Sequence, residues 1–450
     1  MSAPDPDALF WCEHVLLPDG PASGVAVAVS GDRFTAVTPA AAPPAGATPP
    51  AGATVLRGLT VPGLANAHSH AFHRALRART HDGSGDFWTW REAMYAVAER
   101  LDPDSYLALA RAVYAEMALA GITVVGEFHY LHHGPGGAPY ADPNAMGAAV
   151  AQAAREAGIR ITVLDTCYLT GGFGQDLTPA QARFSDGDVG GWLGRVSRFD
   201  PGPGAKLGAA VHSVRAVPAR DVEMVAEWAA RGAVLHAHVS EQPAENEACL
   251  AATGRTPTAL LHSAGAVASN FTAVHGTHLT PSDIDLYGMN RATVCFCPTT
   301  ERDLADGVGP AGALRAAGAA ISLGSDSHAV IDLFEEARGV ELDERLVTGR
   351  RGTHPAEDLL AAATAAGHAC LGWRDAGRIE PGALADLVTI SLDTPRTAGC
   401  PPTAATAVFA ATAADVRHVV ASGRVVVADG VHTLVEDVPG ALRAAIEAVR

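Results

Sequence analysis

Lysine is almost absent from this chain, because Lys206 is the only lysine among its 32 basic residues. The 49 acidic residues outnumber the basic ones and give a formal net charge of −17 at pH 7. No block of basic residues interrupts this acidic sequence. Nucleic acids and anionic membranes are bound through basic surfaces, so we exclude both as partners. A small anionic ligand would need arginines placed at its own site.

We expect neither a disulfide framework, nor a membrane span, nor a secretion signal from this sequence. Its seven cysteines are odd in number and widely scattered, and Cys295 and Cys297 lie in the apolar run ATVCFCP, where two small buried thiols are expected. No uninterrupted apolar run approaches the roughly 18 residues of a membrane span. The first fifteen residues have no basic stretch followed by an apolar one. We therefore expect a cytoplasmic protein.

In the middle of the chain, neither of the phosphate-binding motifs GxGxxG and GxxxxGK(S/T) follows the first predicted strand, which argues against an open nucleotide-binding sheet. It contains instead eight apolar, strand-like runs, each followed by a segment of helical periodicity or polarity. The runs are residues 59–68, 121–130, 160–168, 206–213, 233–241, 271–279, 292–300 and 319–327. Strands that alternate with helices form parallel sheets, and eight such units predict a (β/α)8 barrel of the TIM type.

The two ends of the chain differ from this middle. Short apolar runs with period-two alternation, among them FWCEHVLL, GVAVAVS and VRHVVASGRVVVADG, are separated by turn residues. Such runs predict half-buried β-strands. We therefore predict an α/β protein in which residues 61–382 form the barrel, while residues 1–60 and 383–450 together build a small β-sandwich domain.

Ionisable side chains gather at the C-terminal ends of the predicted barrel strands. These ends form the active site of a (β/α)8 barrel, and an unpaired ionisable group is costly to bury at the end of a core strand. Most of the eight strands nevertheless end in one. The side chains concerned are His68, His70, Glu127, His129, Tyr130, His212, His236, His238, Glu241, His275, His278 and Asp326. This pattern predicts an enzyme.

Four of these side chains suit a metal. His68 and His70 are two residues apart and face the same side of a strand, although such a pair alone is weak evidence. His238 and Asp326 add a third imidazole and a carboxylate from other strand ends. Three nitrogen ligands and one oxygen ligand suit a catalytic Zn²⁺, with Fe²⁺ or Mn²⁺ as alternatives. We predict one divalent metal ion, which would lower the pKa of bound water and make hydroxide available.

Two further strand-end groups are placed to move protons. Glu241 follows His238 by three positions, just beyond the strand, within reach of a nucleophile or a leaving group. His275, in AVHGTH, can polarise a substrate or help to deprotonate water. We predict that Glu241 and His275 are catalytic side chains.

Other residues are candidates for holding the substrate. Arg91, in the aromatic run FWTWR, and Arg215, three residues past His212, can each make a paired contact with a carboxylate. Each arginine alone is more typical of a surface, but two beside strand ends in so acidic a chain favour an anionic substrate. Tyr130 can donate a hydrogen bond to the same molecule.

These motifs resemble a known family. PGLANAHSH, HVSE, VHGTH and LGSDSH are similar to the metal-site signatures of the amidohydrolase superfamily, and GRIEPGALADLVTISLD resembles the return from its barrel to its terminal β-sandwich. More specifically, HSHAFHRAL, FWTWREAMY, GEFHYLHH, HSVRAV, HVSEQPAEN and CPTTERDLADG resemble the formimidoylglutamate deiminases, over most of the chain. This resemblance implies hydrolysis of N-formimidoyl-L-glutamate to N-formyl-L-glutamate and ammonia, a step in histidine degradation.

The resemblance also implies roles for individual residues. It keeps the four predicted metal ligands and makes Asp326 a catalytic, proton-handling group together with Glu241 and His275. It also adds His212 to the substrate contacts, beside Arg91, Tyr130 and Arg215. The chain departs from the family at His73, where glutamine is common. A neutral imidazole donates one hydrogen bond where an amide donates two. His73 lies off the face shared by the two metal histidines, so we predict that it contacts the substrate.

Binuclear members of the family use a carboxylated lysine or a glutamate to bridge two metals. Lys206 precedes its strand and so lies at the wrong end of the barrel, while Glu127 is a candidate bridge. We favour one metal. Three alternatives stay open: an aminohydrolase for a guanine- or cytosine-like ring, which would not need two arginines; an N-acyl amino acid amidohydrolase; and an inactive binding protein, although such proteins usually lose metal ligands. For the assembly we expect a homodimer.

Overall fold

The computed structural model describes residues 6–39, 48–80 and 87–450, and within them the strands form two eight-stranded sheets. The sheet from the middle of the chain is entirely parallel, with the order β12-β11-β10-β9-β8-β7-β6-β5. Its strands are β5 (Leu64–Ser69), β6 (Ile122–His129), β7 (Arg160–Cys167), β8 (Ala205–Val211), β9 (Leu235–Val239), β10 (Phe271–His275), β11 (Thr293–Phe296) and β12 (Ala320–Leu323). Each of the eight predicted runs overlaps one of these strands, although β5 and β8 each extend one residue beyond the run.

The parallel sheet closes where β5 meets the segment after β12. Ser69 pairs with Asp326, and the backbone N–H groups of Ser325 and Asp326 donate to the carbonyl oxygen of His68 at 3.1 and 3.0 Å. The N–H of His70 donates in turn to the carbonyl oxygen of Asp326 at 3.2 Å. These hydrogen bonds complete a (β/α)8 barrel, so the predicted fold class is confirmed.

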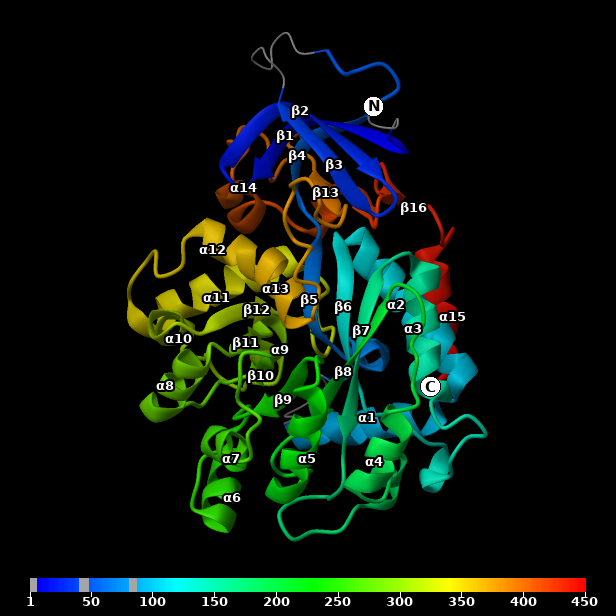
Figure 1. The fold of residues 1–450 in the computed structure, drawn as a ribbon, viewed down its shortest axis with the longest axis vertical. Helices are drawn as coiled ribbons and strands as arrows, with labels where there is room; N and C mark the ends of the chain where they lie inside the picture. The colour runs from blue at the N-terminus through cyan, green and yellow to red at the C-terminus, as the bar shows by residue number, and fades with distance from the viewer. Residues whose placement is uncertain (1–5, 40–47, 81–86) are drawn as a thin grey trace.

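The second sheet is built from both ends of the chain and lies at one end of the barrel, in the upper part of Figure 1. Its order is β16-β15-β14-β13-β4-β1-β2-β3. The strands are β1 (Ala8–Leu17), β2 (Gly20–Ser30), β3 (Arg33–Pro39), β4 (Thr54–Pro62), β13 (Leu387–Ile390), β14 (Val416–Ala421), β15 (Arg424–Ala428) and β16 (Val431–His432). The hydrogen-bonded order of these strands is continuous. The predicted domain boundaries at residues 60 and 383 stay predictions.

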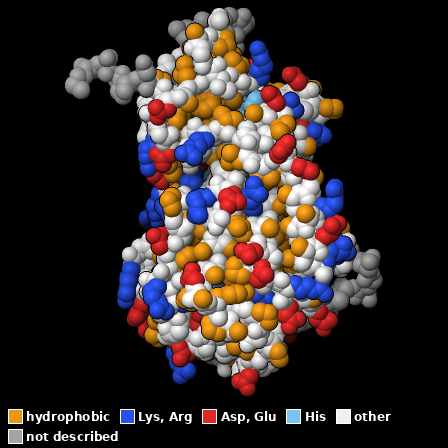
Figure 2. Space-filling model, turned by 90° about the vertical axis from the view of Figure 1, so that its right-hand side faces the viewer, with side chains coloured by type: hydrophobic (Ala, Val, Ile, Leu, Met, Phe, Trp, Pro, Cys, Tyr) orange, Lys and Arg blue, Asp and Glu red, His pale blue; other side chains and the backbone are white. Residues whose placement is uncertain are grey.

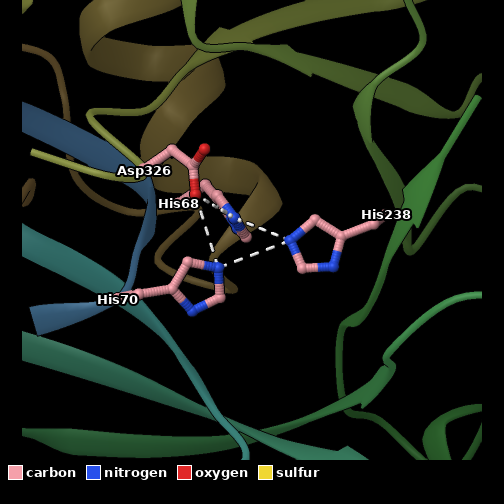
Figure 3. A group of neighbouring side chains, drawn as sticks. All are labelled: His68, His70, His238 and Asp326. Atoms are coloured by element: carbon pink, nitrogen blue, oxygen red, sulfur yellow. Dashed lines mark hydrogen bonds and ion pairs between the residues drawn. The ribbon is translucent and has the colours of Figure 1, made fainter. Parts of the chain in front are cut away.

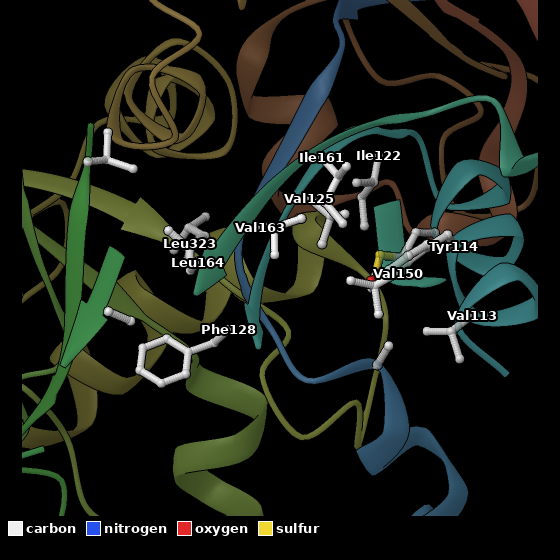
Figure 4. Packing of buried hydrophobic residues seen from close by; sticks show 14 of the residues in the cluster. Val113, Tyr114, Ile122, Val125, Phe128, Val150, Ile161, Val163, Leu164 and Leu323 are labelled. Atoms are coloured by element: carbon white, nitrogen blue, oxygen red, sulfur yellow. The ribbon is translucent and has the colours of Figure 1, made fainter. Parts of the chain in front are cut away.

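Helices surround the barrel (Figure 1). Val113 of α2 and Val150 of α3 belong to the same buried cluster as Val125 of β6 and Val163 of β7, as Figure 4 shows, while α15 packs against α2. The α-helices are α1 (Phe87–Arg100), α2 (Pro103–Leu119), α3 (Ala145–Ala157), α4 (Val189–Val196), α5 (Ala219–Ala229), α6 (Pro243–Thr253), α7 (Pro257–Ser263), α8 (Pro281–Asn290), α9 (Pro298–Asp303), α10 (Ala311–Ala317), α11 (Leu333–Thr348), α12 (Ala356–Ala361), α13 (Gly367–Cys370), α14 (Ala404–Phe409) and α15 (Val438–Ala448).

The start of α2 shows how the sequence sets these helix boundaries. The carboxylate of Asp102 accepts the backbone N–H of Ser105 at 2.8 Å, and the Ser105 hydroxyl accepts the backbone N–H of Asp102 at 2.9 Å. Pro103 occupies the first helical position, where a missing N–H costs nothing. This reciprocal capping separates α2 from α1, whose last residues precede it directly.

A buried ion pair joins the barrel to the terminal sheet. Asp386, just before β13, accepts hydrogen bonds from Arg160 of β7 at 3.0 Å and from the hydroxyl of Thr123 in β6 at 3.1 Å. The backbone N–H of Ser422 donates to the same carboxylate at 2.8 Å. Because these donors come from both sheets, Asp386 fixes the orientation of one sheet on the other.

The surface carries charges of both signs. On the face shown in Figure 2, acidic and basic side chains are interspersed, without a continuous basic area. Among the described residues, no helix is both long and apolar enough to cross a membrane.

Candidate active site

The four side chains predicted to bind a metal converge at the C-terminal end of the barrel (Figure 3). His68 lies in β5 and His70 follows that strand directly. His238 lies in β9, and Asp326 lies in the segment that follows β12. All four are buried, and their ligand atoms lie within 4.8 Å of one another. Nε2 of His238 is 3.2 Å from Nε2 of His68 and 3.4 Å from Nε2 of His70. Oδ1 of Asp326 lies 3.2 and 3.4 Å from the same two nitrogens.

Hydrogen bonds on the far side of the imidazoles show that this cluster suits a cation. Nδ1 of His70 is 3.0 Å from the carbonyl oxygen of Phe128, and Nδ1 of His238 is 2.9 Å from that of His212. A carbonyl oxygen only accepts, so each Nδ1 carries the proton and each neutral ring presents a lone pair at Nε2. Two lone pairs cannot hydrogen-bond to each other. Burial lowers the pKa of both rings well below the usual value, which disfavours a proton between them.

The spacing of the ligand atoms fits the same conclusion. Zn–N bonds of 2.0–2.1 Å in a tetrahedral site place neighbouring ligand atoms about 3.3–3.4 Å apart. Nε2 of His238 and Oδ1 of Asp326 each lie 3.2–3.4 Å from the Nε2 atoms of His68 and His70, and all four ligand atoms lie within 4.8 Å of one another. The residues present therefore fit a metal site with four protein ligands.

Asp326 is held by the backbone that closes the barrel. Its φ of 39° lies in the left-handed region, which residues other than glycine seldom adopt. Burial by itself raises the pKa of this carboxyl, but the hydrogen bond with His68 and the charges of His68 and His275 hold the pKa well below its usual value. Asp326 is therefore ionised and supplies the negative charge that a cation needs here.

His275 connects this cluster to two glutamates. Its Nε2 lies 3.7 Å from Oε1 of Glu241 and 4.0 Å from Oδ2 of Asp326, and its Nδ1 lies 3.3 Å from Oε1 of Glu301. Burial lowers the pKa of His275, but the charge of Glu241 and the hydrogen bond with Glu301 raise it well above the usual value. Burial also raises the pKa of Glu241. The three predicted catalytic residues thus lie together, in an arrangement that can hold and move a proton.

Glu301 is a part of this site that the sequence analysis missed. It lies in α9, not at a strand end, and the backbone N–H of Cys297 donates to its Oε1 at 2.9 Å. In the sequence, its position one helical turn after the end of the seventh barrel strand was the only sign that it belongs to the site. The hydrogen bond with Nδ1 sets the direction in which Nε2 of His275 points.

A pocket of about 640 Å³, mouth included, opens over the metal cluster. All five predicted substrate contacts line it, namely His73, Arg91, Tyr130, His212 and Arg215. Aromatic side chains form much of the remaining wall, namely Trp90, Tyr95, Tyr168 and Phe184. The structure therefore brings every predicted site residue to the wall of one pocket except His68, which belongs to the metal cluster but is fully buried.

The two arginines stand where this pocket joins a second hollow. Arg91 comes from α1 and its Nε donates to the hydroxyl of Tyr95 at 2.6 Å, while Nε of Arg215 lies 3.6 Å from Oε1 of Glu245. The adjoining hollow, of about 1030 Å³, shares Arg91, Arg215 and Glu241 with the first. Two cations therefore line the approach to the metal cluster.

His73 and Tyr130 form a pair on the pocket wall. Nε2 of His73 lies 3.0 Å from the hydroxyl of Tyr130, and the His73 ring lies 4.5 Å, centroid to centroid, from that of His70. Nδ1 of His73 is buried and has no hydrogen-bond partner among the described residues. Burial lowers the pKa of His73 to about 3, so the ring is neutral. His212 lies nearby, with its ring 5.6 Å from that of Tyr130.

The two other residues considered for a metal lie outside the cluster. The carboxylate of Glu127 accepts hydrogen bonds from the hydroxyl of Ser69 at 2.8 Å, the backbone N–H of Ala71 at 2.7 Å and the hydroxyl of Tyr106 at 3.2 Å. Lys206 lies at the start of β8, with its ammonium 4.3 Å from the ring centre of Trp373. Neither belongs to the group of four ligand atoms.

Comparison with known proteins agrees with this geometry. The chain matches the model of the amidohydrolase family over residues 59–426, which include every strand of the barrel and all four clustered side chains. A relative from Pseudomonas aeruginosa named formimidoylglutamate deiminase is 35% identical over 439 residues, or 94% of this chain and 95% of that protein.

Two solved structures share the whole fold. An amidohydrolase from Brucella melitensis has a TM-score of 0.88 at 30% identity, over 98% of this chain and 100% of that one. An adenosine deaminase from Xanthomonas campestris with bound zinc has a TM-score of 0.83 at 25% identity, over 99% and 98% of the two chains. The chain therefore belongs to the amidohydrolase family of hydrolytic enzymes.

Proposed function

We propose that this protein is a metal-dependent formimidoylglutamate deiminase, which hydrolyses N-formimidoyl-L-glutamate to N-formyl-L-glutamate and ammonia in histidine degradation. The observation that carries the proposal is the placement of Arg91 and Arg215 in the pocket that opens over the metal cluster. The substrate carries two carboxylates, one on the carbon that bears the formimidoyl-substituted nitrogen and one at the end of the side chain. Guanidinium groups bind carboxylates through paired hydrogen bonds, whereas a neutral ring offers the two arginines no negative charge.

The proposed cofactor is one divalent ion, Zn²⁺, held by His68, His70, His238 and Asp326. Imidazole and carboxylate ligands suit zinc, and the Xanthomonas campestris neighbour carries it. When bound, such an ion lowers the pKa of water and so supplies a nucleophile at neutral pH.

Glu241 and His275 handle the protons of the reaction. Because burial raises the pKa of Glu241, its carboxyl holds a proton more readily than an exposed glutamate and can pass it to the nitrogen that leaves as ammonia. His275, anchored by Glu301, keeps a proton on the Nε2 that faces Glu241 and Asp326. Its charge attracts both carboxylates, without a hydrogen bond to either.

The pocket wall orients the rest of the substrate. Arg91 and Arg215 take the carboxylates, and Tyr130 with His73 contacts the chain between the carboxylates and the formimidoyl group. The aromatic lining keeps bulk water from the reacting carbon, which strengthens the polar contacts made there.

The test is ammonia release by purified protein from N-formimidoyl-L-glutamate and from adenosine, beside acetate release from N-acetyl-L-glutamate. We expect release from the first only, its loss after chelation and its return with Zn²⁺. Absence of release by metal-loaded protein would overturn the substrate, and preferred turnover of adenosine or N-acetyl-L-glutamate would favour the ring aminohydrolase or the N-acyl amino acid amidohydrolase. Release that persists after complete removal of metal would overturn the metal dependence.

Two variants test the assigned roles. Glu241→Gln should lower kcat by about 10²–10⁴-fold, the usual contribution of a general acid–base group, with metal content unchanged. The exposed Glu247 of the same region provides the matched control, Glu247→Gln. Arg215→Met should raise KM far more than it lowers kcat, because the arginine holds substrate and lies outside the group of metal ligands.

A further inference from the structure

Beside the metal cluster lies a second group of ligand-bearing side chains, Glu241, His275 and Asp306. Each offers one ligand atom, these atoms lie within 4.8 Å of one another, and all three residues are buried. They come from the loop after β9, the end of β10 and the loop after α9. We propose that they form a second divalent-cation site, weaker than the first, whose occupation inhibits the enzyme. The inhibition rests on the proposed function, but the binding does not.

Asp306 is the observation that points to a ligand. Only 3% of its surface is exposed, and its Oδ2 has no hydrogen-bond partner among the described residues. The side-chain amide of Gln242 donates to Oδ1. The carboxylate is thus anchored through one oxygen, while the other is buried and uncommitted. An unpaired carboxylate oxygen is costly to bury, and a bound cation removes that cost.

The backbone of Asp306 keeps the carboxylate in this position. Its carbonyl oxygen lies 2.7 Å from Nε2 of His278, and its N–H donates to the carbonyl oxygen of Glu301 at 2.9 Å. The loop after α9 is therefore tied to both neighbouring elements. A site that is already formed loses little ordering entropy when an ion binds.

His275 has the arrangement of a metal ligand. Glu301 takes the hydrogen bond of its Nδ1, which is the usual support for an imidazole that binds metal through Nε2. The Nε2 atom lies 3.7 Å from Oε1 of Glu241, longer than a hydrogen bond, so the two groups are near one another without being paired. An ion between them would be bound by both.

The local charge favours the same ion. Burial and the neighbouring charge of Glu241 raise the pKa of Asp306 to about 8, a sign of carboxylates crowded together away from water. One imidazole and two carboxylates suit Zn²⁺, and also Mn²⁺ or Co²⁺. With three protein ligands against four in the first cluster, the second site should bind more weakly.

Occupation of this site removes the proton-handling groups from the reaction. Glu241 and His275 cannot bind the second ion through their ligand atoms and exchange protons with substrate at the same time. Activity should therefore rise as the first site fills and fall as the second fills, although the first ion stays bound. The side chains that make the enzyme work would also make it sensitive to excess metal.

The experiment is a Zn²⁺ titration of metal-free protein by equilibrium dialysis with metal analysis, beside activity measured at each concentration. We expect two ions per chain, with dissociation constants at least tenfold apart, and inhibition that follows the second. Asp306→Asn should bind one ion, keep the activity of the singly loaded enzyme and shift half-inhibition to at least tenfold higher Zn²⁺. Asp285→Asn, the same change at an exposed position of α8, serves as the matched control and should behave as the unaltered protein.

Several outcomes would overturn the proposal. One ion per chain in the unaltered protein would do so, as would two ions in both the unaltered protein and Asp306→Asn, because the second would then lie elsewhere. If Asp306→Asn does not fold, an anomalous difference map at the zinc edge from crystals of the unaltered protein decides: density among Glu241, His275 and Asp306 supports the site and its absence refutes it. Binding of two ions by a protein that does not release ammonia would refute the proposed function alone.

Discussion

Arg183 should hold α1, which carries part of the pocket wall, in its position. This arginine is 1% exposed and comes from the short helical turn Pro179–Phe184. Its Nε donates to the carbonyl oxygen of His133 at 2.9 Å and one terminal nitrogen to that of Leu101 at 2.6 Å. The other terminal nitrogen donates to the carbonyl oxygen of Ala98, in the last turn of α1. One buried guanidinium thus ties the end of α1 to the loop after β6.

The structure sets the size of the expected effect. Three hydrogen bonds from a charged donor contribute about 1.5–3 kcal/mol each, or about 5–9 kcal/mol together. Burial of the guanidinium opposes this by several kcal/mol, which leaves a net loss of about 2–4 kcal/mol when methionine replaces Arg183. Four pocket-lining residues, Arg91 among them, lie on α1. A KM about tenfold higher, equivalent to about 1.4 kcal/mol, is expected from a displaced α1.

The assay combines steady-state kinetics on N-formimidoyl-L-glutamate with guanidinium chloride unfolding. Arg183→Met should raise KM and leave kcat nearly unchanged, because Arg183 makes no contact with the metal cluster. Arg183→Lys, which keeps a charged donor, should give an intermediate KM, and Arg198→Met at an exposed position should change neither quantity. A destabilised Arg183→Met with normal KM would refute the positioning role, and a fall in kcat at constant KM would place its effect at the metal centre.

Three further predictions concern the metal, the pocket and the joint between the sheets. His238→Ala should weaken metal binding by more than the about 10–100-fold typical of losing a supporting contact, as metal analysis after dialysis would show. His73→Gln should lower KM without changing kcat, because an amide donates two hydrogen bonds; an equal loss of kcat would contradict this. Asp386→Asn should cost about 3–5 kcal/mol by leaving Arg160 buried and unpaired. Burial alone raises the pKa of Asp386, but Arg160 holds it below the unfolded value. This stabilisation is therefore full above about pH 4 and is lost as pH falls further, so acid unfolding curves of the two proteins should converge.

Barrel strands could be predicted because each is an apolar run bounded by turns and followed by a helix. β9, for example, is five residues long and fully buried, and the predicted run around it also included Ser240 and Glu241. The predicted runs are longer than the strands because they also include residues just beyond the strand ends, among them the site residues Glu241 and Asp326. Metal ligands could be predicted at the strand ends for a related reason. The residue types that bind metal there are ones that a core strand seldom contains.

The residues that the sequence did not reveal come from helices and loops. Glu301 and Asp306 belong to α9 and to the loop after it, and Arg183 to a turn between β7 and α4. Charged residues in helices and loops are ordinarily exposed. Nothing in the local sequence of these three residues therefore separates them from the other charged residues of the chain. Their importance depends on which strand end they pack against, and that is a property of the closed barrel.

Glu127 shows that a carboxylate near a strand end need not be a metal ligand. It ends a barrel strand as a buried carboxylate, in the same way as Asp326, and from sequence both were candidates for a metal. In the structure, donors from Ser69, Ala71 and Tyr106 occupy both oxygens of Glu127. The contacts of the Asp326 carboxylate are instead with imidazole nitrogens that need a cation. The number of N–H and O–H donors that face a carboxylate determines whether it has a structural role or is available to bind a metal. Those donors come from chain segments that are brought together only when the protein folds.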